Sequence, residues 1–134
     1  MIFLDSSFLV AYGVNRDSNH ERATKIIGEI VSGKYGKVFS SDYILDEAVT
    51  VALVRSKSLA NAVSVGETIK ESTNMIKLDQ SEFEESWNAF KLQSGSRFSF
   101  TDCTIISIMK KYGILNLATF DEEFKKIKWA NIVG

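Results

Sequence analysis

The chain has 134 residues, of which 45% are hydrophobic and 25% charged, and its net charge at neutral pH is −1. These values exclude a disordered chain, and we expect one domain over residues 1–134. Cys103 is the only cysteine and His20 the only histidine, which excludes an internal disulfide and a structural zinc site built from them. No apolar run approaches the roughly 20 residues of a membrane span, and the N-terminus lacks the basic start of a signal peptide. We therefore expect a soluble, cytoplasmic protein.

Short β-like runs alternate with segments long enough for helices. These runs occupy residues 2–4, 37–39, 75–78 and 115–118, and a fifth is expected near residues 127–129. Strands that alternate with helices indicate a parallel sheet covered by helices on both faces. The first run is apolar at consecutive positions, as in a central strand that is buried on both sides.

Several helix boundaries are also visible. Residues 79–82 have the spacing of a capping box, and residues 99–102 and 119–122 are plausible helix starts. Gly113 follows two lysines and a tyrosine and is a typical helix end. Within the helix that begins near residue 80, Phe83, Trp87 and Phe90 recur at helical spacing, so we expect them in the core.

Four acidic residues lie where a sheet of this kind binds ligands. Asp5 and Asp121 follow predicted strands, and Asp102 opens a predicted helix. Glu47 interrupts the apolar face of another helix, between Ile44 and Val51, where an unpaired charge is costly. Ligands of open parallel sheets bind outside the carboxyl ends of the strands, so these acids can gather at one edge.

Each acid alone has a simpler explanation, as a helix cap, a first-turn acid or the edge of an apolar face. Gathered together, carboxylates about 5 Å apart repel one another by roughly 3 kcal/mol per pair and need a cation. Oxygen ligands without His or Cys select Mg²⁺ or Mn²⁺, which can activate a water for phosphodiester hydrolysis. A net charge of −1 does not exclude a nucleic-acid substrate, because such an enzyme uses several carboxylates for its ions.

Four segments spread along the whole chain resemble the motifs of PIN-domain nucleases, especially the VapC-like toxin ribonucleases. They are residues 2–7, 41–47, 98–102 and 117–124. The acids they contain follow one another at intervals of 42, 55 and 19 positions. The order and spacing make the set more specific than any single motif.

The resemblance implies a three-layer α/β/α sandwich with a central, mainly parallel sheet of four to five strands. It also implies that Asp5, Glu47, Asp102 and Asp121 are the catalytic, metal-binding residues of a Mg²⁺- or Mn²⁺-dependent endoribonuclease that cleaves RNA with metal-activated water. Asp46 is the alternative to Glu47 as the second acid, but the spacing and the apolar neighbours of Glu47 favour Glu47.

The same resemblance implies supporting residues and partners. Ser6 and Thr119 are candidates for contacts to the metal, its water or the substrate. Toxin members of the family are held inactive by a cognate antitoxin, and many relatives form homodimers. Arg97, Lys110 and Lys111 are candidates for contacts to RNA phosphates.

Other interpretations remain open. A non-catalytic RNA-binding or assembly module on the same fold is one, and a free-standing RNA-processing nuclease is another. A response-regulator receiver requires paired acids after the first strand, whereas here Asp5 is followed by Ser6 and Ser7. A phosphatase of the haloacid dehalogenase type requires an Asp at the position that Ser7 occupies.

Overall fold

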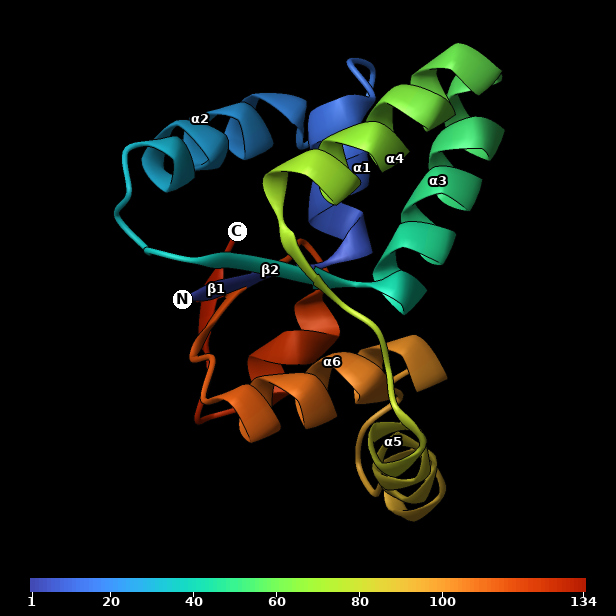
Figure 1. Cartoon of the computed structure of the whole chain (residues 1–134), viewed down its shortest axis with the longest axis vertical. Coiled ribbons are helices and arrows are strands. Elements are labelled where there is room, and N and C mark those ends of the chain that lie inside the picture. Colours follow the sequence, from blue (N-terminus) through green and yellow to red (C-terminus); the bar gives the residue numbers. More distant parts are fainter.

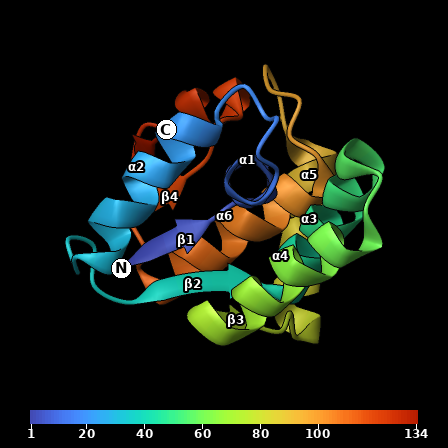
Figure 2. The ribbon, with the colours of Figure 1, turned by 90° about the horizontal axis from the view of Figure 1, so that it is seen from above.

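The computed structural model describes all 134 residues and contains one sheet of five parallel strands. In chain order the strands are β1 (Ile2–Leu4), β2 (Val38–Ser41), β3 (Asn74–Ile76), β4 (Asn116–Ala118) and β5 (Asn131–Val133). Their order in the sheet is β3-β2-β1-β4-β5. Because β1 lies in the middle, whatever follows it in sequence lies at the centre of the carboxyl edge (Figure 2).

Strand β1 is held on both sides in a fixed register. Ile2 pairs with Val38 of β2 and with Asn116 of β4, and the Asp5 amide donates a hydrogen bond of 3.0 Å to the carbonyl of Ala118. Every residue of β1 is buried, as its unbroken apolar sequence predicts.

Helices cover both faces of the sheet. On one face lie α1 (Ser6–Gly13), α2 (His20–Val31), α3 (Asp42–Ser56) and α4 (Leu59–Ser72), and on the other lie α5 (Gln80–Leu92) and α6 (Phe100–Tyr112) (Figure 1). This is the three-layer sandwich that the sequence predicts. No helix is both long and apolar enough to span a membrane.

The predicted helix boundaries at residues 79 and 99 are confirmed. Asp79 with Glu82 forms a capping box at the start of α5, and Ser99 with Asp102 forms one at the start of α6. Helix α6 ends at Gly113, whose φ of +66° favours glycine.

The expected position of the fifth strand is wrong. Residues 127–129 do not form a strand, and β5 begins only at Asn131. Asp121 caps a short 3₁₀ helix, η1 (Glu122–Lys126), and the Ile127 amide still bonds back to Phe124. Phe124 is fully buried, so the chain first packs this turn against the core and reaches the sheet later.

The expected burial of the aromatic residues of α5 is also largely wrong. Phe83 and Trp87 remain 38% and 42% exposed, whereas Phe90 packs against the core. Helix α5 packs beside α6 at the margin of the molecule (Figure 1). The rings of Phe83, Trp87 and Phe90 on α5 each lie against the ring of Phe100 at the start of α6.

Candidate active site

Asp5 lies at the centre of the carboxyl edge of the sheet, between β1 and α1. It caps α1, and its Oδ1 accepts a hydrogen bond of 2.7 Å from the Ser6 amide. Its Oδ2 accepts bonds of 2.6 Å from the Ser7 hydroxyl and 2.7 Å from the Thr119 hydroxyl. Asp5 is only 3% exposed, so the chain fixes this carboxylate firmly in one orientation.

The neighbouring strand supplies the contact from Thr119. Leu4 pairs with Ala118, and this register places the residues that follow the two strands side by side. The Thr119 hydroxyl lies 3.1 Å from that of Ser7 and accepts a hydrogen bond of 3.0 Å from the amide of Asp121. The Thr119 hydroxyl therefore links Asp5 to the turn that carries Asp121.

Glu47 reaches the same edge from α3. Ser41, the last residue of β2, caps this helix, and Glu47 lies in its second turn. The Ser6 hydroxyl donates a hydrogen bond to Oε2 of Glu47 and lies 3.3 Å from Oδ1 of Asp5. Asp46 is exposed and does not line the cleft described below, so the geometry favours Glu47, as the apolar neighbours predict.

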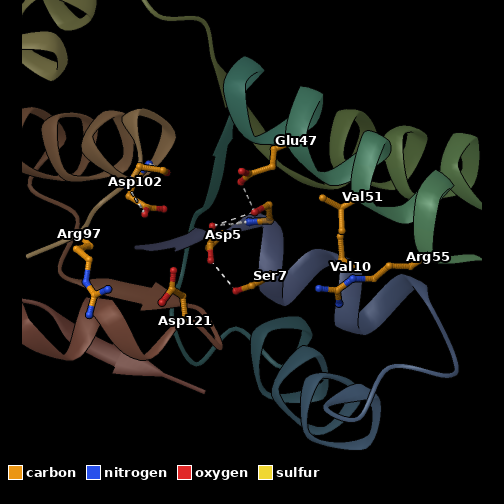
Figure 3. A pocket seen from close by; sticks show the side chains of 11 residues that line it. Asp5, Ser7, Val10, Glu47, Val51, Arg55, Arg97, Asp102 and Asp121 are labelled. Carbon is orange, nitrogen blue, oxygen red and sulfur yellow. Dashed lines mark hydrogen bonds between the residues drawn. The ribbon is translucent and has the colours of Figure 1, made fainter. Parts of the chain in front are cut away.

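Asp102 and Asp121 approach from the other side of Asp5. The Asp102 carboxylate accepts a bond of 2.8 Å from the Ser99 amide at the start of α6. Asp121 caps η1 by accepting a bond of 2.8 Å from the Glu123 amide. Asp121 therefore serves as a helix cap and Asp102 as the acid of a capping box, yet both also face one cleft (Figure 3).

The four acids line one open cleft of about 410 Å³ (Figure 3). Its polar and charged lining consists of Asp5, Ser6, Ser7, Glu47, Arg55, Arg97, Ser99, Asp102 and Asp121, and its apolar lining of Val10 and Val51. Of the other predicted residues, Thr119 does not line the cleft but bonds Asp5, which does. Lys110 and Lys111 lie at the far end of α6 and do not line the cleft.

Sequence reasoning did not single out Ser7, Ser99 or Arg55 as functional residues. Ser7 lies two positions after Asp5, where its hydroxyl can bond the Asp5 carboxylate. This spacing is a sequence signal that could have identified Ser7. Arg55 lies eight positions after Glu47, which keeps it near the same face of α3. That spacing was the available signal, but it gains meaning only when the cleft is seen.

Burial and mutual repulsion act on the acids of the cleft. Burial raises the pKa of Asp5 above its usual value, although bonds from Ser7, Thr119 and Ser6 partly offset the rise. Burial, and then the charges of Asp5 and Asp121, raise the pKa of Asp102 to about 6. None of the four acids forms an ion pair with a basic side chain.

The donor set fits a hard divalent cation, because carboxylate and hydroxyl oxygens are present without imidazole or thiolate. No group of three or more acidic, His or Cys side chains is already arranged as a metal cage. The carboxylate of Asp5 instead accepts hydrogen bonds on both oxygens from neighbouring hydroxyl and amide groups. The chemistry of the residues thus suits an ion, and the acids lack any other cationic partner.

Comparison with known proteins relates the chain to PIN-domain ribonucleases. The model of the PIN domain matches residues 2–130. The chain is 27% identical over 124 residues to the 23S rRNA-specific endonuclease VapC20 of Mycobacterium tuberculosis, covering 92% of each chain. It is 25% identical to the ribonuclease VapC6 of Methanocaldococcus jannaschii, covering 98% of this chain and 95% of that one.

Solved structures show the same relationship. The crystal structure of VapC20 of Mycobacterium tuberculosis, a Sarcin-Ricin loop cleaving toxin, superimposes with a TM-score of 0.87 at 25% identity over 100% of both chains. VapBC2 of Rickettsia felis, bound to a DNA fragment from its promoter, matches 98% of this chain and 97% of that one. Its TM-score is 0.68 at 17% identity, and this likeness shows the fold alone. With the family model matching nearly its whole length, the chain belongs to the PIN-domain family and is a homologue of VapC ribonucleases.

Proposed function

We propose that this protein is a Mg²⁺- or Mn²⁺-dependent endoribonuclease and the toxin of a toxin–antitoxin pair. The observation that carries the proposal is the meeting of Asp5, Glu47, Asp102 and Asp121 in one cleft without a basic partner. The four side chains come from four separate segments of the chain, so local helix capping alone does not account for their convergence. The names of the homologues VapC20 and VapC6, an endonuclease and a ribonuclease, support RNA as the substrate.

Each acidic residue has a distinct setting in the proposed reaction. Asp5 is the fixed centre, because three donors hold its carboxylate. Glu47 lies on one side of it and Asp102 and Asp121 on the other, so the acids surround the space where a phosphate would enter (Figure 3). When bound, the divalent ion would neutralise these charges and activate a water molecule for attack on phosphorus.

The hydroxyl groups have a positioning role. The Ser6 hydroxyl donates to Glu47 while the Ser6 amide donates to Asp5, and the Thr119 hydroxyl donates to Asp5 while accepting from the amide of Asp121. In the hydrolysis itself, the water oxygen forms a bond to phosphorus, the bond from phosphorus to a ribose oxygen breaks, and a proton passes to that oxygen. The hydroxyls keep the acids in place through these changes.

We further propose that the protein forms a homodimer and binds a cognate antitoxin. We place it in the cytoplasm, where its RNA substrate is found. The VapBC2 complex among the structural neighbours supports a protein partner. An apolar groove of about 330 Å³ between α3 and α4 supports a protein contact as well. Leu59 and Val63 on its margin are 69% and 51% exposed.

The experiment that tests the proposed activity is cleavage of a total RNA pool that includes ribosomes, in Mn²⁺, in Mg²⁺ and in EDTA. Sequencing of the new RNA ends identifies the cut sites. We expect cuts at a restricted set of sites in metal and none in EDTA. Binding of RNA without any cleavage in either metal would instead favour the non-catalytic binding module.

A further inference from the structure

The cleft extends beyond the acids along the groove between α1 and α3. Val10 of α1 and Val51 and Arg55 of α3 line this extension (Figure 3). Glu47, Val51 and Arg55 follow one another at intervals of four residues, so an acid, an apolar side chain and a cation lie in a row along α3. Arg55 is about 12 Å along the helix from Glu47, at 1.5 Å per residue.

Asp17 holds the guanidinium of Arg55 at the end of this extension. The bond from Nη1 to Oδ2 of Asp17 is 2.9 Å long, and the Asp17 side chain is 8% exposed. Oδ1 of Asp17 accepts a bond of 2.8 Å from the Asn19 amide, which orients the carboxylate. The guanidinium makes no other hydrogen bond, and its side chain is 59% exposed. Its remaining N–H donors are therefore available to a ligand.

A second arginine lines the opposite end of the cleft. Arg97 lies in the loop before α6, near Asp102 and Asp121, whereas Arg55 lies beyond Glu47 and Ser7 (Figure 3). The cleft thus has a cation at each end, acids in the middle and an apolar stretch between the acids and Arg55. A polyanionic strand laid along it would meet phosphate-binding groups on both sides of the cleavage position.

We propose that Arg55 binds a phosphate of the RNA strand next to the one that is cleaved, and that Val10 and Val51 contact the intervening nucleoside. The inference rests on the proposed nuclease activity and adds the path of the strand, which runs between Arg97 and Arg55 across the acids. Guanidinium suits this position because its fixed fork can bond Asp17 and a phosphate at once. Asp17 is then a positioning residue for Arg55.

A purely structural role is the alternative, because Arg55 also neutralises a nearly buried carboxylate. Two variants separate the two roles: Arg55→Gln, and the double variant that combines Arg55→Gln with Asp17→Asn. The double variant removes both charges, keeps the net charge of the chain and leaves no unpaired buried acid. Lys34→Gln is the matched control, because Lys34 also pairs with an acid, Glu29 at 2.7 Å, but precedes β2 at the amino edge of the sheet.

The measurement uses an RNA oligonucleotide that spans a site cut by the wild-type protein in Mn²⁺. Steady-state cleavage is followed from about 50 to about 200 mM salt, with melting curves for every variant. For Arg55→Gln and the double variant we expect KM to rise about tenfold with little change in kcat. The slope of log(kcat/KM) against log[salt] should become shallower by about 0.7, the value of one single-strand phosphate contact.

The outcomes are distinct. A double variant that melts like the wild type but has the raised KM and the shallower slope supports the phosphate contact. If the double variant and Arg55→Gln keep the wild-type KM and slope, the contact is overturned and Arg55 serves only the fold. Failure of the wild-type protein to cut any RNA overturns the proposed function, and the proposed path of the strand with it. Lys34→Gln should match the wild type throughout.

Discussion

The hydroxyl of Thr119 donates a hydrogen bond of 2.7 Å to Oδ2 of Asp5, a residue 114 positions earlier in the chain. Both side chains are almost fully buried, at 2% and 3% exposed. The contact exists because β1 and β4 are neighbours in the sheet although they lie at opposite ends of the sequence. It joins the first acid of the cleft to the turn that carries the last.

Replacement of Thr119 by valine keeps the shape of the side chain and removes this donor. We expect Thr119→Val to lower the free energy of unfolding by about 1–2 kcal/mol and to reduce RNA cleavage about tenfold, because a buried carboxylate loses a partner. Thr119→Ser keeps the hydroxyl and should retain most of the activity. Equal activity of the valine and serine variants would show that the hydroxyl does not matter.

Glu47 and Asp46 provide a pair of adjacent acids with opposite expectations. Glu47 lines the cleft and Asp46 is exposed outside it. We expect Glu47→Gln to reduce cleavage by at least about 100-fold, because a carboxylate that serves the ion is lost, and Asp46→Asn to remain within about twofold of the wild type. The reverse result in the same assay would reassign the second acid to Asp46.

The raised pKa of Asp102 predicts how the stability of the metal-free protein depends on pH. Its pKa is about 6 in the folded protein against an ordinary value of 3.8, so the folded state binds this proton more tightly than the unfolded state. The free energy of unfolding should therefore fall as the pH rises from about 4 to about 6. The part due to Asp102 should be on the order of 1–2 kcal/mol, allowing for screening of a partly exposed group.

The variant Asp102→Asn isolates this part, since a carboxamide oxygen can still accept the bond from the Ser99 amide. In EDTA at pH 7 we expect the variant to be more stable than the wild type and its stability to vary less between pH 4 and 6. Added Mn²⁺ should raise the melting temperature of the wild type more than that of the variant. A variant that is less stable than the wild type in EDTA would contradict the destabilisation of the Asp102 carboxylate by burial and by repulsion from Asp5 and Asp121.

Lys111 provides a test of the structure away from the cleft. It bonds Glu82 at 2.9 Å and Asp79 at 3.3 Å, and Glu82 is 2% exposed. We expect Lys111→Gln to lower the free energy of unfolding by about 1–3 kcal/mol, because a buried carboxylate loses its cation. Lys70→Gln, which removes an exposed pair with Glu67, should change it by less than about 0.5 kcal/mol. Chemical denaturation measures both, and equal effects would contradict the burial of Glu82.

The elements of the fold with strong local signals could be predicted from sequence. Each of these signals lies in the residues of the element itself. They are the apolar run at residues 2–4, the capping boxes at Asp79 and Ser99, and the Gly113 that ends α6. The position of β5 could not be predicted, because it depends on how Phe124 packs a 3₁₀ turn into the core. The partial exposure of Trp87 likewise depends on where α5 docks, which helical periodicity does not specify.

The candidate site was predictable where residues follow strands, open helices or interrupt an apolar helix face. Asp5, Asp102 and Asp121 occupy such positions, and Glu47 stood out as an acid on an apolar face. Arg55 was not predictable, because its relation to the cleft depends on the packing of α1 against α3 and on the contact with Asp17. Lys110 and Lys111 share the helix of Asp102 but lie at its other end, as the predicted helix start near Asp102 and helix end at Gly113 already imply.

The most direct test of the central claim is RNA cleavage by the wild type and by Asp5→Asn at equal concentration in Mn²⁺, with EDTA as the control. Asparagine keeps the size of the side chain and one acceptor oxygen, and melting curves should show that both proteins are folded. The account predicts metal-dependent cleavage by the wild type and a loss of at least about 100-fold in the variant. Undiminished cleavage by a folded Asp5→Asn protein, or cleavage by the wild type that persists in EDTA, would contradict it.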